Sequence, residues 1–299
     1  MALLCALPLL LAACERFEGD QAVPAYLAID SISVANTPGS SASQLQGYFT
    51  SLIDCAEVTV YVKGDTAQTS LGVYELPCCV PLLRAGVIDR VLVSPVVKQN
   101  GIAATHIAYP YYTAIELSDV VAAPDDTTRL GSLVTHYNAK GRCAWQEFFE
   151  PGAQGLELDS VVQRLLYNQP GGIDTILADN GCGVIHVSAE QTTLDFWSKD
   201  TIDLSHYGAD SYLYLEMDYW TDFRLSVGMK APIMQGGAPA VKSAMVLRPN
   251  QGWHKIYINL GRLWGQFGHN PAPRLYFSVL NSGRQAGNVY LDNMKLLVI

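Results

Sequence analysis

The sequence is poor in charge and has no cluster of positive side chains. Charged residues make up 16% of the 299 residues, and 19 lysines and arginines stand against 28 aspartates and glutamates, a formal net charge of −9. Binding to a phosphate backbone requires clustered cations, so nucleic acid is excluded as a partner. An anionic lipid surface would not hold this acidic chain by charge alone. With 49% hydrophobic residues, the chain can nevertheless bury a sizeable core and is not disordered.

The sequence also lacks the spacings that mark common catalytic sites. Its histidines show no H-x-x-x-H or H-E-x-x-H pattern, and there is no G-x-S-x-G turn, phosphate loop or dinucleotide fingerprint. Glu216 and Asp218 have the i, i+2 spacing that places two carboxylates on one strand face, which a glycan hydrolase could use. Such a pair is common in strands, however, and no cleft signature surrounds it. We therefore predict that the protein is not an enzyme.

No two cysteines have C-x-x-C spacing, so the pattern indicates neither a redox motif nor a zinc site. Beyond the N-terminal segment the chain holds Cys55, Cys78, Cys79, Cys143 and Cys182. Neighbouring cysteines in an extended strand point to opposite faces, which disfavours a bond between the second and third of these. An odd number leaves at least one thiol outside any internal pairing. Two alternatives stay open: buried free thiols, or one disulfide within the first domain.

The N-terminal segment is a short apolar run that ends at a cysteine. Residues 3–13 carry no charge, small residues directly precede Cys14, and charged residues follow at once. A membrane-spanning helix needs roughly 20 apolar residues, whereas a secretory leader needs about 7–15 followed by small residues. The Leu-Ala-Ala-Cys ending resembles the lipobox of bacterial lipoproteins, although no lysine or arginine precedes the apolar run. The resemblance implies a signal peptide over residues 1–13, a lipid on Cys14, and an acylated tether over residues 14–24.

The remainder of the chain has the pattern of an all-β protein. Val58, Val60 and Val62 alternate with other residues, and residues 212–217 alternate in the same way. The pair Asn100-Gly101 predicts a tight turn. The one helix that the pattern suggests covers residues 160–167 and spans barely two turns. Short strands separated by turn signals indicate β-sandwiches or small barrels.

We predict two β-sandwich domains, with a boundary near residue 140 after the loop-like segment 122–128. The first is a small β-module over residues 25–139, and the second covers residues 140–299. The second resembles the jelly-roll domains of carbohydrate-binding modules and related galactose-binding-like folds, on the sequences FFEPG at 148–152, GWHK at 252–255 and YLDN at 290–293. The first is similar to β-modules of uncharacterised surface lipoproteins of Bacteroidota, on VYELP at 73–77 and YPYY at 109–112. The similarity of the first domain to these lipoproteins implies no activity.

The jelly-roll resemblance implies that the first and last strands of the second domain lie side by side. Glu150 and Asp292 would then come together, at the place where jelly rolls of this kind often hold a structural calcium ion. Carboxylate and carbonyl oxygens suit calcium. In the alternative, Glu150 caps a turn and Asp292 lies on a solvated edge.

Aromatic side chains in the second domain are candidates for ligand binding, because sugar recognition combines flat aromatic faces with hydrogen-bonding groups. The candidate residues are Trp197, Trp220, Asp222, Trp264 and His269. Trp220 and Asp222 follow a strand at a turn, and the last two lie in a glycine-punctuated loop, where side chains are often exposed. Tryptophan in a β-domain is more often partly buried packing, and Trp253 lies in a strand-like run typical of the core.

We therefore expect a non-catalytic lipoprotein of the bacterial envelope, anchored to the outer membrane on its periplasmic or surface face, that binds carbohydrate or another cell-surface ligand. The alternative is a structural accessory subunit of an export, uptake or gliding complex, which contacts other envelope proteins. A glycan hydrolase is the least favoured interpretation. A ligand binder is expected to expose aromatics, whereas a machinery subunit is expected to expose a large apolar patch.

Overall fold

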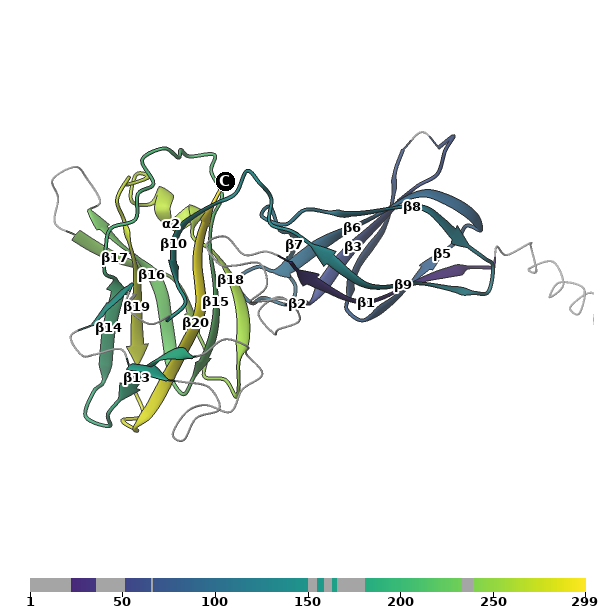
Figure 1. Cartoon of the computed structure of the whole chain (residues 1–299). Coiled ribbons are helices and arrows are strands. Elements are labelled where there is room, and N and C mark those ends of the chain that lie inside the picture. The colour runs from purple at the N-terminus through teal and green to yellow at the C-terminus, as the bar shows by residue number, and fades with distance from the viewer. Residues whose placement is uncertain are drawn as a thin grey trace, which may run out of the picture.

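The computed structural model of this chain describes residues 23–35, 52–65, 67–149, 155–158, 163–165, 181–232 and 239–299. Within these ranges the chain is almost entirely β-strand, as predicted, and forms four sheets with one short helix, α2 (Gly261–Gly265). Figure 1 shows the sheets arranged as two sandwiches placed end to end. None of the described helices has the length and apolar character needed to cross a membrane.

The first sandwich is built from the strands up to Thr135. One of its sheets contains β1 (Ala25–Val34), β2 (Leu52–Ile53), β5 (Cys78–Leu82) and β9 (Thr127–Thr135). The other contains β3 (Cys55–Tyr61), β4 (Thr69–Glu75), β6 (Gly86–Lys98), β7 (His106–Ala108) and β8 (Ile115–Ala122). Strand β1 pairs antiparallel with β2 and β5 but parallel with β9. Alternating valines and isoleucines of these strands fill the space between the sheets, as their period of two requires.

The second sandwich is the jelly roll, and its strands pass repeatedly from one sheet to the other. The sheet nearer the first sandwich contains β10 (Arg142–Glu147), β12 (Gln163–Leu165), β13 (Cys182–Val187), β15 (Leu213–Thr221), β18 (His254–Asn259) and β20 (Gly287–Val298). The opposite sheet has the order β11 (Leu156–Leu158), β14 (Thr193–Ser198), β19 (Arg274–Leu280), β16 (Arg224–Pro232) and β17 (Pro239–Leu247). Large apolar side chains such as Phe196 and Phe277, whose rings stack at 4.9 Å, fill the core between them.

Several local predictions can be compared with this fold. The Asn100-Gly101 turn is confirmed: both residues have positive φ, 57° and 66°, which is the geometry of a type I′ turn. The helix predicted over residues 160–167 is wrong where the structure describes it, because Gln163–Leu165 forms strand β12 against β13. The rest of that segment lies outside the described residues. Cys55, Cys78, Cys79 and Cys143 are free thiols. The predicted boundary near residue 140 stays a prediction, and the strands on either side of it end at Thr135 and begin at Arg142.

The two sandwiches meet through the Asn100-Gly101 turn and a cluster of tyrosines. Asn100 donates its backbone N–H to the Tyr257 carbonyl at 2.8 Å and accepts from the Asn259 N–H at 2.9 Å through its side-chain oxygen. The ring of Tyr109, from the first sandwich, lies 5.3 Å from that of Tyr214 and 5.0 Å from that of Tyr257. The Tyr111 hydroxyl lies 2.9 Å from the Leu297 carbonyl of β20. The second sandwich is therefore attached by close side-chain packing and not only by the connecting chain.

Candidate ligand-binding face

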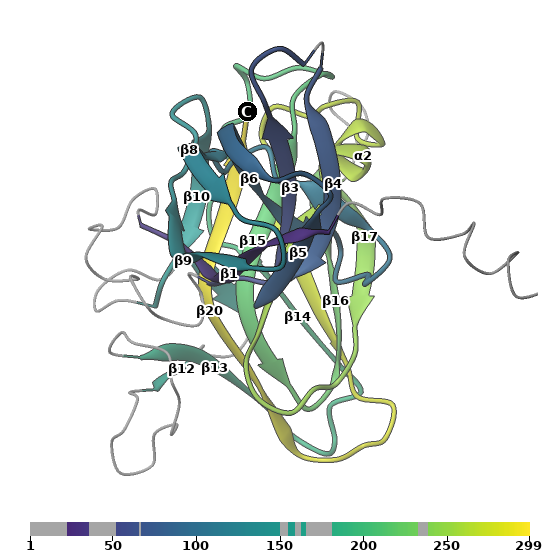
Figure 2. The ribbon, with the colours of Figure 1, turned by 90° about the vertical axis from the view of Figure 1, so that its right-hand side faces the viewer.

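The outer surface of the sheet β11–β14–β19–β16–β17 carries a row of polar and aromatic side chains. This sheet lies on the side of the second sandwich away from the first (Figures 1 and 2). Strand pairing sets Glu157 opposite Trp197, Trp197 opposite Tyr276, and Tyr276 opposite Gly228. We call this surface the aromatic–acid face, and it comprises Glu157, Asp195, Trp197, Lys230, Arg274, Tyr276 and Ser278.

The period of two in β14 and β19 explains why these side chains point outward. Leu194, Phe196 and Phe277 are buried in the core, so Asp195, which lies between the first two, must point to the opposite surface. Trp197 and the residues that flank Phe277 point outward for the same reason. The alternation of side chains along a strand thus explains both which residues of this sheet are buried and which are exposed.

The Trp197 ring is held by polar partners at its edge and over its face. Its indole N–H donates to Glu157 Oε2 at 2.9 Å, and the Lys230 ammonium lies 4.3 Å from the ring centroid. Arg274 is 3.5 Å from the same Glu157 oxygen. A half-buried tryptophan fixed in this way presents a pre-positioned ring, which lowers the entropy cost of binding.

A second group on the same face surrounds Tyr276. Ser278 donates its hydroxyl to Asp195 Oδ1 at 2.6 Å. Burial, together with the neighbouring Asp195 carboxylate, raises the pKa of Tyr276 to about 12. The phenol therefore stays protonated at physiological pH and can donate a hydrogen bond. The exposed Asp195 carboxylate offers acceptors beside it.

Gly228, which lies opposite Tyr276 on β16, is buried and packs closely against β17. A Cβ atom on Gly228 would lie 2.1 Å from the Lys242 carbonyl oxygen, at a bulge in the pairing of β16 with β17. Next to it, the Ser226 and Ser243 hydroxyls lie 2.8 Å apart. The face thus combines aromatic rings, carboxylates, cations and hydroxyl groups. This mixture suits a neutral, hydroxyl-rich ligand, to which both donors and acceptors are needed.

Of the predicted ligand-binding residues, Trp197 lies on this face, whereas Trp220 lies on β15 of the other sheet and Asp222 in the turn that follows β15. The half-buried Trp220 ring packs 5.2 Å from that of Tyr290 on β20. Asp222 accepts the backbone N–H of Asn288 at 2.8 Å, so one of its oxygens serves the turn. These two residues are therefore not neighbours of Trp197. Trp253, expected in the core, is only half-buried, with its ring 6.5 Å from Tyr290.

Trp264 is buried, although the sequence predicted that it would be exposed. The glycine-punctuated segment folds as helix α2 and the turn after it, and Trp264 is only 1% exposed. Its indole N–H donates to the Asn270 carbonyl at 2.8 Å, and the His269 ring packs against it edge-on at 4.8 Å. The enclosed Trp264 ring cannot carry a ligand on its face, so we remove Trp264 from the candidate site. His269 is half-buried, and its role stays a prediction. The glycines permit the tight turn, and the tryptophan fills the core.

The predicted lipid and calcium positions fall largely outside the described residues. Cys14 and Glu150 both lie outside them, so the proposed pairing of Glu150 with Asp292 stays a prediction. Asp292 is fully buried, which differs from the solvated edge given as the alternative. It lies opposite Asp218 in the pairing of β15 with β20, and its carboxylate accepts the Asn293 N–H at 2.8 Å.

The acid pair on β15 is enclosed in protein. Glu216 and Asp218 both have 0% exposure. Glu216 accepts from the Tyr137 hydroxyl at 2.7 Å and lies 3.5 Å from each of the Lys255 and Lys295 ammonium groups. Burial opposes the charge on Glu216, but the two lysines hold its pKa below the usual range. The pair is therefore a buried charge network, without the open cleft that glycoside hydrolysis requires.

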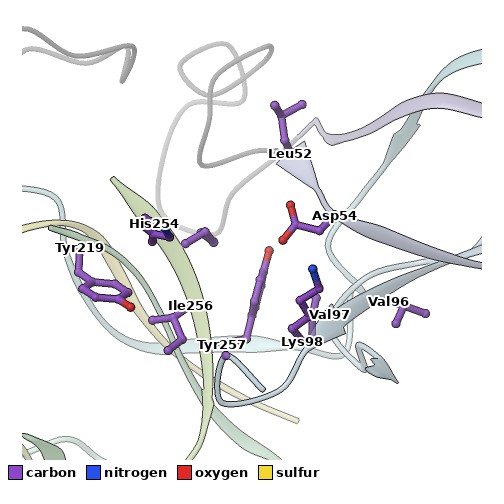
Figure 3. Close-up of a pocket in the computed structure, with 11 residues that line it drawn as sticks. Leu52, Asp54, Val96, Val97, Lys98, Tyr219, His254, Ile256 and Tyr257 are labelled. Atoms are coloured by element: carbon purple, nitrogen blue, oxygen red, sulfur yellow. The ribbon is translucent and has the colours of Figure 1, made fainter. Parts of the chain in front are cut away.

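A cavity of about 260 Å³ lies between the two sandwiches. Figure 3 shows Asp54 and Lys98 of the first sandwich facing Tyr257, with Tyr219 and His254 of the second sandwich along the other side. The volume is slightly below the range of about 300–1,000 Å³ for small-molecule sites. Sequence reasoning missed this cavity because its walls come from segments far apart in the chain.

Comparisons with known proteins gave only distant structural similarity. No protein-family model and no curated protein matches the chain. Among solved structures, it is similar to a xylan-binding domain of carbohydrate-binding module family 22, with 12% identity over 52% of this chain and 93% of that one and a TM-score of 0.34. A xylan-binding domain from Paenibacillus barcinonensis has 11% identity over 51% and 98%, with a TM-score of 0.34. An exo-β-agarase has 11% identity over 52% of this chain and 24% of the enzyme, with a TM-score of 0.35. The similar structures thus include both carbohydrate-binding modules and an enzyme.

Proposed function

We propose that the protein is a non-catalytic carbohydrate-binding protein and that the aromatic–acid face is its binding surface. The observation that carries this proposal is the row Glu157–Trp197–Tyr276, fixed by hydrogen bonds on an exposed sheet. A pyranose ring presents C–H groups on its faces and hydroxyl groups around its edge. An aromatic ring contacts the former, and carboxylates, ammonium and hydroxyl groups bind the latter.

The row of side chains runs across neighbouring strands, which favours a glycan chain over a single enclosed sugar. Charged groups of both signs occur along it, so the ligand need not be charged. Lys230 lies over the Trp197 ring, and a sugar that stacked there would move this flexible side chain aside. Tyr276, the next residue in the row, offers a second contact beside it.

The first prediction concerns Trp197→Ala. We expect it to weaken binding to the best polysaccharide ligand at least tenfold, about 1.4 kcal/mol, because aromatic anchors dominate such interfaces. Purified protein lacking residues 1–14 would be screened on a glycan array that includes xylan and β-1,4-galactan. Affinity for the best ligand would then be measured by calorimetry.

Tyr212→Ala is the matched control, because Tyr212 is 56% exposed but lies off the face. It should bind as the unmodified protein does. Circular dichroism would confirm that both variants are folded. The proposal fails if no glycan binds, or if Trp197→Ala and Tyr212→Ala have equal affinity.

We further propose that Cys14 carries the lipid that anchors the protein to the outer membrane. The apolar leader that ends in Leu-Ala-Ala-Cys supports this assignment. A single lipid-modified cysteine can carry more than one acyl chain. Stable anchoring requires more than one chain. Metabolic labelling with palmitate should mark the full chain and be lost in Cys14→Ser. Equal labelling of the two proteins would refute the assignment.

A further inference from the structure

Three possible metal ligands of different chemistry converge on the first sandwich. The thiol of Cys55, a carboxylate oxygen of Glu75 and a ring nitrogen of His106 all lie within 4.8 Å of one another. Cys55 is buried, whereas Glu75 and His106 are exposed. The cluster is therefore anchored in the sheet and reachable from solvent.

Strand pairing explains why these residues share one surface. In the sheet order β4–β3–β6–β7, Cys55 lies opposite Glu75 on one side and Val96 on the other. Two residues beyond Val96, Lys98 lies opposite His106. Because side chains alternate along each strand, all of these positions face the same way.

The donor set suits a divalent ion of intermediate softness. Zinc binds thiolate sulfur at about 2.3 Å, imidazole nitrogen at about 2.0–2.1 Å and carboxylate oxygen at about 2.0–2.2 Å. Ligand atoms of one zinc ion therefore lie roughly 3.5 Å apart. Side-chain rotations that move the ligand atoms by about 1 Å would bring the three residues into contact with one ion. Calcium and magnesium are poor candidates because they take oxygen ligands.

We propose that Cys55, Glu75 and His106 form a zinc-type metal site with three protein ligands and one open position. The proposal goes beyond carbohydrate binding and does not rest on it, since the aromatic–acid face belongs to the other sandwich. The spacing of Cys55, Glu75 and His106 in the sequence hides the site, because zinc motifs usually place two ligands a few residues apart.

Lys98 competes with a metal ion for the Glu75 carboxylate. Its ammonium group lies 2.8 Å from Glu75 Oε1, so in the metal-free protein it neutralises the carboxylate that a metal would use. Lys98 also lines the cavity between the sandwiches (Figure 3). The side chain therefore has space to move into when an ion replaces it. Metal binding must also release the thiol proton, so affinity should rise with pH.

Titration with cobalt(II) tests the site, because a cobalt–thiolate bond gives a charge-transfer absorption that other ligands do not. We expect one equivalent of cobalt to produce this band in the reduced protein and one equivalent of zinc to remove it. Glu75→Gln and His106→Asn should each weaken binding at least about tenfold, since even outer-shell changes cost 10–100-fold. Lys98→Gln should tighten binding about two- to fivefold, the factor that an exposed ion pair represents.

Cys79→Ser and His136→Asn are the matched controls, since both residues are exposed on the same sandwich outside the cluster. They should leave cobalt affinity unchanged. Cys55→Ser should abolish the band, and its folding would be checked by circular dichroism. Glu75→Gln and His106→Asn change exposed side chains, so they keep the test decisive if Cys55→Ser is unstable. The proposal is overturned if neither the unmodified protein nor Lys98→Gln binds one equivalent, or if His106→Asn binds as tightly.

Discussion

At the scale of the residue, Glu216 shows how a buried charge depends on its partners. It is fully buried among two lysines and the Tyr137 hydroxyl, where the sandwiches meet. Burial also lowers the pKa of Lys295 to about 8. A charge network of this kind adds little net stability when complete but is costly when one member is removed, because the remaining charges have no counter-ion.

Glu216→Ala should therefore lower the free energy of unfolding by about 3–5 kcal/mol. Urea denaturation at pH 7 measures this directly. Glu157→Ala is the control, since its contact with Arg274 is an exposed ion pair and should cost less than about 1 kcal/mol. If the two variants lose equal stability, the network does not have the role that we assign to it.

The sequence identified tryptophans as candidate ligand-binding residues, but it could not show which of them are exposed. Trp197 and Trp264 have the same chemistry, and each lies near glycine or polar residues in the chain. The first points outward because its neighbours on β14 fill the core, whereas the second is enclosed by helix α2 and His269. Tyr276 and Glu157 were missed because only strand pairing places them beside Trp197.

At the scale of the element, β16 depends on one glycine. Gly228 lies where β17 bulges toward it, and the Lys242 carbonyl oxygen occupies the space that a Cβ atom would need. Backbone atoms cannot move aside as the end of a side chain can. The strand pair therefore has to separate if any side chain is added here.

Gly228→Ala should lower the free energy of unfolding by about 1–3 kcal/mol, the usual cost of overpacking. Gly208→Ala is the matched control, because a Cβ atom at Gly208 meets nothing within 4 Å. Its stability should change by less than about 0.5 kcal/mol. Thermal or urea denaturation compares the two, and an unaffected Gly228→Ala would show that β17 tolerates the displacement.

Elements defined by local chemistry were predicted well, and those defined by distant packing were not. Asn100-Gly101 specifies a type I′ turn by itself, because both residues tolerate positive φ. Residues 160–167 have a helix-like apolar spacing, yet Gln163–Leu165 within them pair with β13 as a strand. Helix α2 is a single short turn with glycine at each end, which no periodicity could indicate.

At the scale of the whole molecule, a cluster of tyrosines packs between the sandwiches. Tyr109, Tyr112 and Tyr257 are buried together, with ring centroids 4.9–6.4 Å apart. Burial raises the pKa of all three phenols well above 10. In the unfolded chain each phenol would titrate near pH 10.

The free energy of unfolding should consequently fall as the pH rises above about 10. There the unfolded chain binds fewer protons than the folded chain, and each buried tyrosine contributes a slope of up to about 1.4 kcal/mol per pH unit. Below about pH 9 these phenols are protonated in both states and contribute no slope. Urea denaturation between pH 8 and 12 would measure the slope, which Tyr257→Phe should reduce by one tyrosine's share. An identical slope in both proteins would contradict this assignment.

The all-β class followed from the sequence because alternation and turn residues are local signals. The joint between the sandwiches did not, since the tyrosines that form it are separated by more than a hundred residues. The run at 109–112 was visible as aromatic sequence, but nothing in it indicated that Tyr214 and Tyr257 would be its partners. The cavity was hidden for the same reason, and the Cys55 cluster was hidden because only strand pairing brings its three residues together.

The position of β1 determines how the first sandwich would respond to mechanical load. This strand starts at the end of the molecule remote from the second sandwich (Figure 1) and is held on both sides, antiparallel by β5 and parallel by β9. A pull on the residues before Ala25 acts along the strand axis. The hydrogen bonds to both neighbours are then strained together in shear and not opened one after another. A chain held by its N-terminal end would thus transmit tension through the strand best placed to withstand it.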